Sequence, residues 1–280
     1  MFDTIKKLFS PVKSLTAEEA RDFMENHPVG SYTLLDVRQP KEYEESHIAG
    51  AKLAPLPQLS DFYKDLNREM PIIVYCAIGG RSRVAAQMLA GNDFVNVFNL
   101  TGGIKSWNGV SAQGPQEMNM EMITGDETPS EVIALAYTME NNLGHFYQLA
   151  QKKVSDSAVI KLLGSLASVE EKHKVFLAHL FEKLDPDTGS RKSLDALALS
   201  TTMEGGFDTD AFLKANSDFL AKETDILDLA MMLETQALDL YIRFAGRMKN
   251  ADSRETLNII ANEEKAHLAA LGDLRNNISG

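Results

Sequence analysis

Short apolar runs alternate with amphipathic helical patterns over the first part of the chain. The apolar runs are typical of buried strands and cover residues 33–37, 71–76 and 96–100. Between or beside them, apolar residues recur at helical spacing in 16–27, 58–69 and 81–90. This alternation predicts an α/β domain with a parallel sheet and helices on its faces.

After Pro129 the pattern becomes helical throughout. Four long helices are predicted, at 129–153, 156–184, 222–249 and 252–276. The short connections within the first and second pair predict two antiparallel hairpins. The stretch 185–221 between them is long enough to cross a bundle, and 193–200 and 208–220 are candidates for short helices. We therefore divide the chain into an α/β domain at 1–112, a linker rich in Gly, Pro, Met and acidic residues at 113–128, and an all-α domain at 129–280.

Charge and composition narrow the function classes. Residues 1–115 carry 12 basic and 13 acidic side chains, whereas residues 116–280 carry 16 and 27, for a net charge of −12. An acidic second half argues against nucleic acid and anionic membrane surfaces, and no apolar run is long enough to span a membrane. The start, 1–11, lacks a signal peptide's apolar core, so a short docking helix or frayed end is favoured over an amphipathic anchor. A single cysteine excludes a disulfide within the chain and suggests a reducing, cytoplasmic setting.

The helical half contains a repeat of potential metal ligands. Glu140, Glu170 and His173 recur 94 residues later as three residues with the same spacing, and a tyrosine lies seven residues after the first glutamate of each copy. The second copy and the two tyrosines are Glu234, Glu264, His267, Tyr147 and Tyr241. A single Glu-x-x-His on a charged helix is usually a solvated face, and we expect Glu171 and Glu263 to be solvated in this way. Two copies in the same register, with upstream glutamates inside apolar helices, favour metal binding instead, because burying such carboxylates without a counter-charge is costly.

The spacing also predicts where these side chains meet. The midpoint between Glu140 and Glu170 is residue 155, and the midpoint between Glu234 and Glu264 is residue 249, so both fall at predicted turns. Each pair should therefore lie level across its hairpin, and two facing hairpins would bring six ligands into one layer. Oxygen and imidazole ligands in this number suit two ions of iron, with manganese or zinc as alternatives. His145 and His179 lie on other helix faces and are predicted to be surface or packing residues.

On these residues, 129–276 resembles the ferritin-like diiron family, specifically its rubrerythrin branch. The resemblance implies a four-helix bundle and a di-metal centre that reacts with peroxide or dioxygen and receives electrons from an external donor. It implies bridging carboxylates at Glu170 and Glu264, terminal carboxylates at Glu140 and Glu234, and one metal-bound histidine on each ion. Tyr147 and Tyr241 match tyrosines that bond to ligand carboxylates, with core packing as the alternative. A homodimer is compatible with the resemblance.

Two departures put peroxidase activity in doubt. Rubrerythrins carry a four-cysteine rubredoxin centre, which a chain with one cysteine cannot form. They also have a further glutamate one turn after the ligand of the third helix, where this chain has Ala237.

The single cysteine, Cys76, ends the apolar strand and opens the segment CAIGGRS, residues 76–82, just before a helical pattern. A strand–loop–helix of this kind gathers backbone N–H groups around the loop centre and points a helix N-terminus at it. These dipoles, together with Arg81, lower a thiol pKa and hold an anion. A cysteine at a strand end is more often buried packing, but the Gly79-Gly80-Arg81-Ser82 continuation favours a reactive site.

Residues 12–110 resemble the single-domain rhodanese family through LLDVRQPKEYEESHIAGA (34–51), CAIGGRS (76–82) and LTGGIKSW (100–107). The resemblance implies that the Cys76 thiolate takes a sulfane sulfur from a small donor and passes it to a thiol or other nucleophilic acceptor. Arg81 would act with Cys76, and the substrate or persulfide would be held by Ala77, Ile78, Gly79, Gly80 and Ser82. Asp36 and Arg38 match paired residues of the family at the end of a neighbouring strand. Their role there is either to support the loop or to contact the substrate.

Two features of the loop refine this expectation. Related phosphatases place five residues between cysteine and arginine, whereas four separate Cys76 from Arg81, which favours sulfur over phosphate. Ala77 and Ile78 give the loop rim no polar side chain, so a persulfide from a protein or small thiol is favoured over thiosulfate. The competing hypothesis is a sensing or docking module attached to a metal-binding or storage scaffold without turnover.

Overall fold

The computed structural model describes residues 12–109, 111–184, 194, 202–216 and 220–279. Three expected segments fall wholly or partly outside these residues: the docking helix or frayed end at 1–11, the candidate helix at 193–200 apart from Leu194, and about half of the crossing segment at 185–221. The chain divides into two compact units, residues 1–118 and 119–280, each with its own hydrophobic core.

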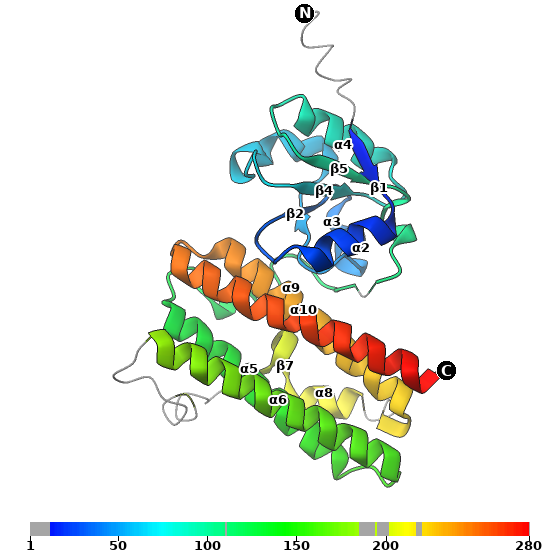
Figure 1. Cartoon of the computed structure of the whole chain (residues 1–280), viewed down its shortest axis with the longest axis vertical. Helices are drawn as coiled ribbons and strands as arrows, with labels where there is room; N and C mark the ends of the chain where they lie inside the picture. The colour runs from blue at the N-terminus through cyan, green and yellow to red at the C-terminus, as the bar shows by residue number, and fades with distance from the viewer. Residues whose placement is uncertain (1–11, 110, 185–193, 195–201, 217–219, 280) are drawn as a thin grey trace, which may run out of the picture. The chain divides into compact units, whose positions relative to one another are not determined.

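The first unit is built on a parallel sheet of five strands in the order β1-β5-β4-β2-β3 (Figure 1). The strands are β1 (Lys13–Leu15), β2 (Thr33–Asp36), β3 (Lys52–Leu53), β4 (Ile72–Tyr75) and β5 (Val97–Leu100). The central strand β4 is buried along its whole length, as its uninterrupted apolar sequence requires. The expected α/β domain with a parallel sheet is confirmed.

Helices α2 (Ala17–Asn26), α3 (Pro40–Glu45) and α4 (Gly80–Ala90) connect these strands. The helix expected at 58–69 is instead a 3₁₀ helix, η1 (Leu56–Asp65). Its apolar residues Leu56, Leu59 and Phe62 recur every third position and pack on the core. A spacing of three aligns side chains on a 3₁₀ helix, which has three residues per turn, and explains the difference. The first unit also contains η2 (Gly103–Ser106).

Part of the expected linker packs on the first unit. The Gly114 N–H donates to the Glu44 carbonyl at 2.8 Å, and the Gln116 side chain accepts from the Leu53 N–H at 3.0 Å. These bonds hold residues 114–116 beside α3 and β3, so the first unit extends past the expected boundary at residue 112.

The second unit is predominantly helical, as expected (Figure 1). Its four long helices are α5 (Pro129–Gln151), α6 (Ser157–Leu184), α9 (Glu223–Arg247) and α10 (Ala251–Ser279). The start of α5 follows from sequence, because Thr128 caps the Glu131 N–H, Glu131 caps the Thr128 N–H, and Pro129 occupies the first turn. The hairpins α5–α6 and α9–α10 form, and α5 also packs on α10.

Shorter elements complete the second unit. They are η3 (Met120–Met122), β6 (Thr202–Met203), η4 (Glu204–Gly206), β7 (Phe207–Asp208) and α8 (Thr209–Ala215). Among them, β6, η4 and α8 pack against α5 or α9. Strands β6 and β7 pair antiparallel, and Met203 and Leu213 join the core of the long helices. No helix in the described part of the chain combines the length and apolar character needed to cross a membrane.

Candidate functional sites

Cys76 lies directly after β4, at the carboxyl edge of the sheet. The Gly79 N–H donates to its Sγ at 3.1 Å, and the Ser82 hydroxyl lies 3.4 Å from the same sulfur. Gly79 has a φ of 95° and precedes α4, so the chain turns sharply and directs the first amides of the helix at the sulfur. The side chains of Cys76 and Ser82 are buried, whereas Ile78 is 67% exposed at the loop rim.

The segment after β5 holds this loop from the other side. The Ile104 N–H donates to the Cys76 carbonyl at 2.8 Å, and the Lys105 N–H donates to the Ala77 carbonyl at 3.1 Å. Because both carbonyls point toward η2, the loop amides are left free to turn toward the sulfur. Gly103 allows this approach: a Cβ there would lie 2.2 Å from the Cys76 carbonyl oxygen.

We expect Gly103→Ala to destabilise the first unit by about 3 kcal/mol or more, because the added methyl meets backbone atoms and Gly103 has a φ of 58°. Denaturant unfolding followed by the fluorescence of Trp107, the chain's single tryptophan, measures this loss. Gly80→Ala is the matched control, since a Cβ at Gly80 meets nothing within 4 Å. Equal stability of the two variants would contradict the close contact.

Hydrogen bonds favour the thiolate form of Cys76. Burial raises the thiol pKa, but bonds from Ser82 and from the loop amides of Ile78 and Gly79 outweigh it, so the pKa lies below its ordinary value. The Ser82 hydroxyl is in turn 2.7 Å from Asn99 Oδ1, which lies buried on β5. Asn99 therefore orients the serine beside the sulfur.

Arg81 begins the helix after the loop and forms a two-point ion pair with Glu42 on α3. Its Nη1 and Nη2 lie 2.8 and 2.7 Å from the two Glu42 oxygens. The hydrogen bonds from Arg81 lower the pKa of Glu42 to about 2, and the same pair raises the pKa of Arg81. Arg81 thus lies beside the loop, paired with Glu42 and also interacting with Cys76.

Asp36 and Arg38 form a buried ion pair at the end of β2. The Arg38 Nη2 lies 2.6 Å from Asp36 Oδ2 and also donates to the Ser46 carbonyl at 2.6 Å. Burial lowers the pKa of Arg38, yet its bonds and proximity to Asp36 raise it overall. Since Asp36 is fully buried and Arg38 nearly so, their contacts favour support of the neighbouring backbone over substrate contact.

In the helical unit the two predicted ligand sets each come together. Glu140, Glu170 and His173 offer ligand atoms within 4.8 Å of one another, and so do Glu234, Glu264 and His267. His173 Nδ1 lies 2.9 Å from Glu170 Oε2 and 3.2 Å from Glu140 Oε2. In the second set, His267 Nδ1 lies 3.4 Å from Glu264 Oε2 and 3.9 Å from Glu234 Oε2.

The two sets adjoin, because the His173 and His267 rings stack with centroids 3.4 Å apart and planes 4° from parallel. The four glutamates are each at most 2% exposed. Burial raises the pKa of Glu170. Burial acts in the same direction on Glu234, but hydrogen bonding with His267 and Glu264 and the charge of the histidines act more strongly in the opposite direction. The net pKa of Glu234 therefore lies below its ordinary value. Oε2 of Glu170 faces His173 Nδ1 and Oε2 of Glu234 faces His267 Nδ1, so the carboxylates of each set converge on one imidazole. These buried acceptors fit a cation ligand set, since buried carboxylate oxygens need a partner.

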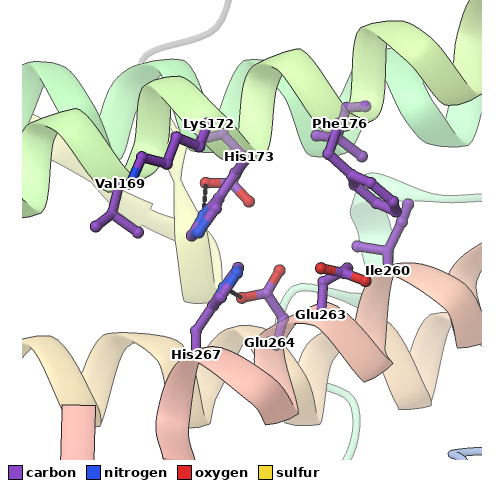
Figure 2. Close-up of a pocket in the computed structure, with 10 residues that line it drawn as sticks. Val169, Lys172, His173, Phe176, Ile260, Glu263, Glu264 and His267 are labelled. Carbon is purple, nitrogen blue, oxygen red and sulfur yellow. Dashed lines mark hydrogen bonds and ion pairs between the residues drawn. The ribbon is translucent and has the colours of Figure 1, made fainter. Parts of the chain in front are cut away.

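A pocket of about 270 Å³ opens onto these sets between α6 and α10 (Figure 2). In Figure 2, His173 and His267 approach each other from α6 and α10, with Val169 on one side of the pocket and Phe176 and Ile260 on the other. Glu263, expected to be solvated, is partly buried and lines this pocket, whereas Glu171 is exposed as expected. The reason is that Glu263 faces the opening beside Glu264.

The remaining candidates differ in their surroundings. Tyr147 and Tyr241 are both buried, and the Tyr241 hydroxyl lies 3.7 Å from Met139 Sδ. This contact fits the packing alternative for Tyr241. His145 and His179 are exposed, as predicted.

Sequence reasoning missed Glu42 and Asn99. Asn99 had a signal: it is a polar residue inside the apolar run 96–100, and a polar side chain on a buried strand needs a partner. Glu42 had none, because it is one of several acids on a charged helix and meets Arg81 only through the fold.

Comparisons with known proteins concern the first unit. The family model "Rhodanese-like domain" matches residues 16–109. The chain is similar to the uncharacterized protein YqhL of Bacillus subtilis (strain 168), 39% identical over 98 residues, covering 35% of this chain and 74% of that protein. It is also similar to the thiosulfate sulfurtransferase GlpE of Ectopseudomonas mendocina (strain ymp), 31% identical over 112 residues, covering 39% of this chain and 99% of that protein. Among solved structures, a rhodanese-like domain protein from Staphylococcus aureus is 28% identical, with a TM-score of 0.32, covering 35% of this chain and 92% of that one.

Proposed function

The chain belongs to the rhodanese-like family through residues 16–109, and from this premise we propose that Cys76 transfers sulfur as a persulfide. The observation that carries the proposal is the setting of the Cys76 sulfur. It accepts a hydrogen bond from Gly79, lies beside Ser82, and has a thiol pKa below its ordinary value. A thiolate at neutral pH is the nucleophile that this chemistry needs.

In the proposed cycle the Cys76 thiolate attacks the outer sulfur of a donor R–S–SH. The donor S–S bond breaks as the new bond to Sγ forms, and the thiol R–SH leaves with the proton, so Cys76 holds a persulfide anion. The loop amides and Ser82 then stabilise this anion as they stabilise the thiolate. An external nucleophile must accept the sulfur, because the chain has no second cysteine.

The mass of the intact protein after incubation with a sulfane-sulfur donor tests the proposal. We expect a gain of one sulfur atom, located on the peptide that contains Cys76 and removed by a thiol reductant. A protein that gains no sulfur from thiosulfate or from an organic persulfide would refute sulfur transfer. It would favour the competing hypothesis of a sensing or docking module.

A second function is proposed for the helical unit, and the paired Glu/His sets support it. We propose that a ferritin-like four-helix bundle binds two metal ions, iron or alternatively manganese or zinc. Glu140 and His173 would hold one ion, Glu234 and His267 the other, and the remaining two glutamates, Glu170 and Glu264, would lie between them. Bound ions would supply redox chemistry toward peroxide or dioxygen, with electrons from an external donor.

The residues of this unit have their own part in that proposal. The carboxylates offset the positive charge of the ions, the stacked imidazoles fix the spacing of the two sets, and the apolar walls at Val169, Phe176 and Ile260 limit water access. Elemental analysis of protein purified without oxygen tests metal binding. About two equivalents of metal are expected. A protein that retains no metal after iron is added and the unbound excess is removed would refute metal binding by this unit.

A further inference from the structure

Arg81, the cationic residue of the reactive loop, forms an ion pair with a residue outside the loop. Arg81 is the one cationic side chain in residues 76–82. Both of its terminal nitrogens bond to Glu42, at 2.8 and 2.7 Å. Paired N–H groups facing both oxygens of a carboxylate make a strong, oriented ion pair, so the Arg81 charge is directed at Glu42.

Two further observations concern the charges around the loop. Glu42 has a pKa of about 2, so it stays ionised throughout the neutral range. Arg38, at the end of the neighbouring strand β2, is buried against Asp36 and forms an ion pair with it. Residues 76–82 themselves therefore offer a donor their backbone dipoles and one positive charge, which is paired with Glu42.

The rim of the loop is apolar as well. Ile78 is 67% exposed, and Ala77 beside it is partly exposed. An exposed isoleucine at the entrance can make apolar contacts with the organic group of a donor, but it offers no hydrogen bond or positive charge to a sulfonate group.

We propose that Glu42 is a specificity-determining residue for the sulfur donor: by pairing with Arg81 it disfavours dianionic thiosulfate and selects a low-molecular-mass organic persulfide. The proposal rests on sulfur transfer at Cys76 and adds the class of donor. With thiosulfate, Cys76 would take the outer sulfur and sulfite would leave carrying both charges, whereas an organic persulfide brings at most one charge to the loop.

Glu42→Gln tests this, because it removes the compensating charge and leaves Arg81 in place with a neutral partner. The second-order rate constant for sulfur uptake by Cys76 is measured by mass spectrometry with thiosulfate and with benzyl persulfide. We expect the thiosulfate constant to rise about tenfold and the benzyl persulfide constant to change less than about threefold. The gain with thiosulfate should shrink as salt is raised, since it is electrostatic.

Glu45→Gln is the matched control, as it makes the same change in net charge on the same helix at an exposed position. Glu42→Asp keeps the charge and should keep the wild-type ratio of the two constants. An equal change with both donors in Glu42→Gln, or the same ratio shift in Glu45→Gln, would overturn the proposal. If the wild type takes up sulfur from neither donor, the proposed sulfur transfer itself fails, which is a distinct result.

Discussion

We expect Cys76→Ser protein incubated with a sulfane-sulfur donor to gain no sulfur, and its rate of sulfur transfer to fall by more than about a thousandfold. A serine hydroxyl stays protonated at neutral pH, so the loop amides and Ser82 have no anion to stabilise. Because Cys76 is the chain's single cysteine, no other thiol can substitute for it. Intact-protein mass spectrometry and a transfer assay measure the loss, and wild-type transfer by Cys76→Ser would place the reaction elsewhere.

The pH dependence of this reaction has a defined direction. The Cys76 pKa lies below its ordinary value, so thiolate and rate rise with pH and level off at a lower pH than for a free cysteine. Ser82→Ala removes a bond to the sulfur and should move the profile to higher pH. Ser168→Ala, in the other unit, serves as the control for a lost serine hydroxyl. A profile that Ser82→Ala leaves unmoved would show that the serine does not tune the thiol.

The sequence predicted the elements well because their apolar periods differ. Strand β4 and helix α5 lie within two residues of their expected bounds at both ends, since an uninterrupted apolar run and a capped, 3.6-residue pattern are distinct signals. Two-residue strands such as β3 lack any period and could not be found. Helix η1 was assigned the wrong type, because a spacing of three also fits part of an α-helical stripe.

The contacts in the two candidate sites also differ in how far the sequence could predict them. Within the loop at 76–82, contacts to the sulfur follow from local spacing and were predictable. The Glu42–Arg81 pair joins residues 39 positions apart on two helices, so its existence depends on how the sheet orders its strands. The ligand sets in the helical unit also join residues far apart in the sequence. They could be predicted because the midpoint of each glutamate pair falls at a turn, which places the two glutamates level across a hairpin.

The largest expected effect in the helical unit concerns metal binding by Glu170. In the metal-free state, Glu140 and Glu170 both lie against the imidazole of His173, and burial disfavours a negative charge on Glu170. Glu170→Gln keeps the side-chain shape and removes that charge. We therefore expect the metal-free variant to unfold at the same or a higher temperature than the metal-free wild type.

With metal the order should reverse. Ions that bind only the folded state at a thousand times their Kd stabilise it by about 4 kcal/mol, which corresponds to roughly 10 °C for a unit of this size. Wild-type protein should gain this shift on addition of ferrous iron without oxygen, whereas Glu170→Gln should gain little of it and retain at most one ion. Far-UV circular dichroism and elemental analysis give the two readouts, and Glu171→Gln, exposed on the same helix, should behave as wild type. A hydrogen-bonding role for Glu170 alone would instead lower the stability of the metal-free variant and leave both proteins unresponsive to iron, because only a ligand carboxylate is unfavourable without the ion and stabilising with it.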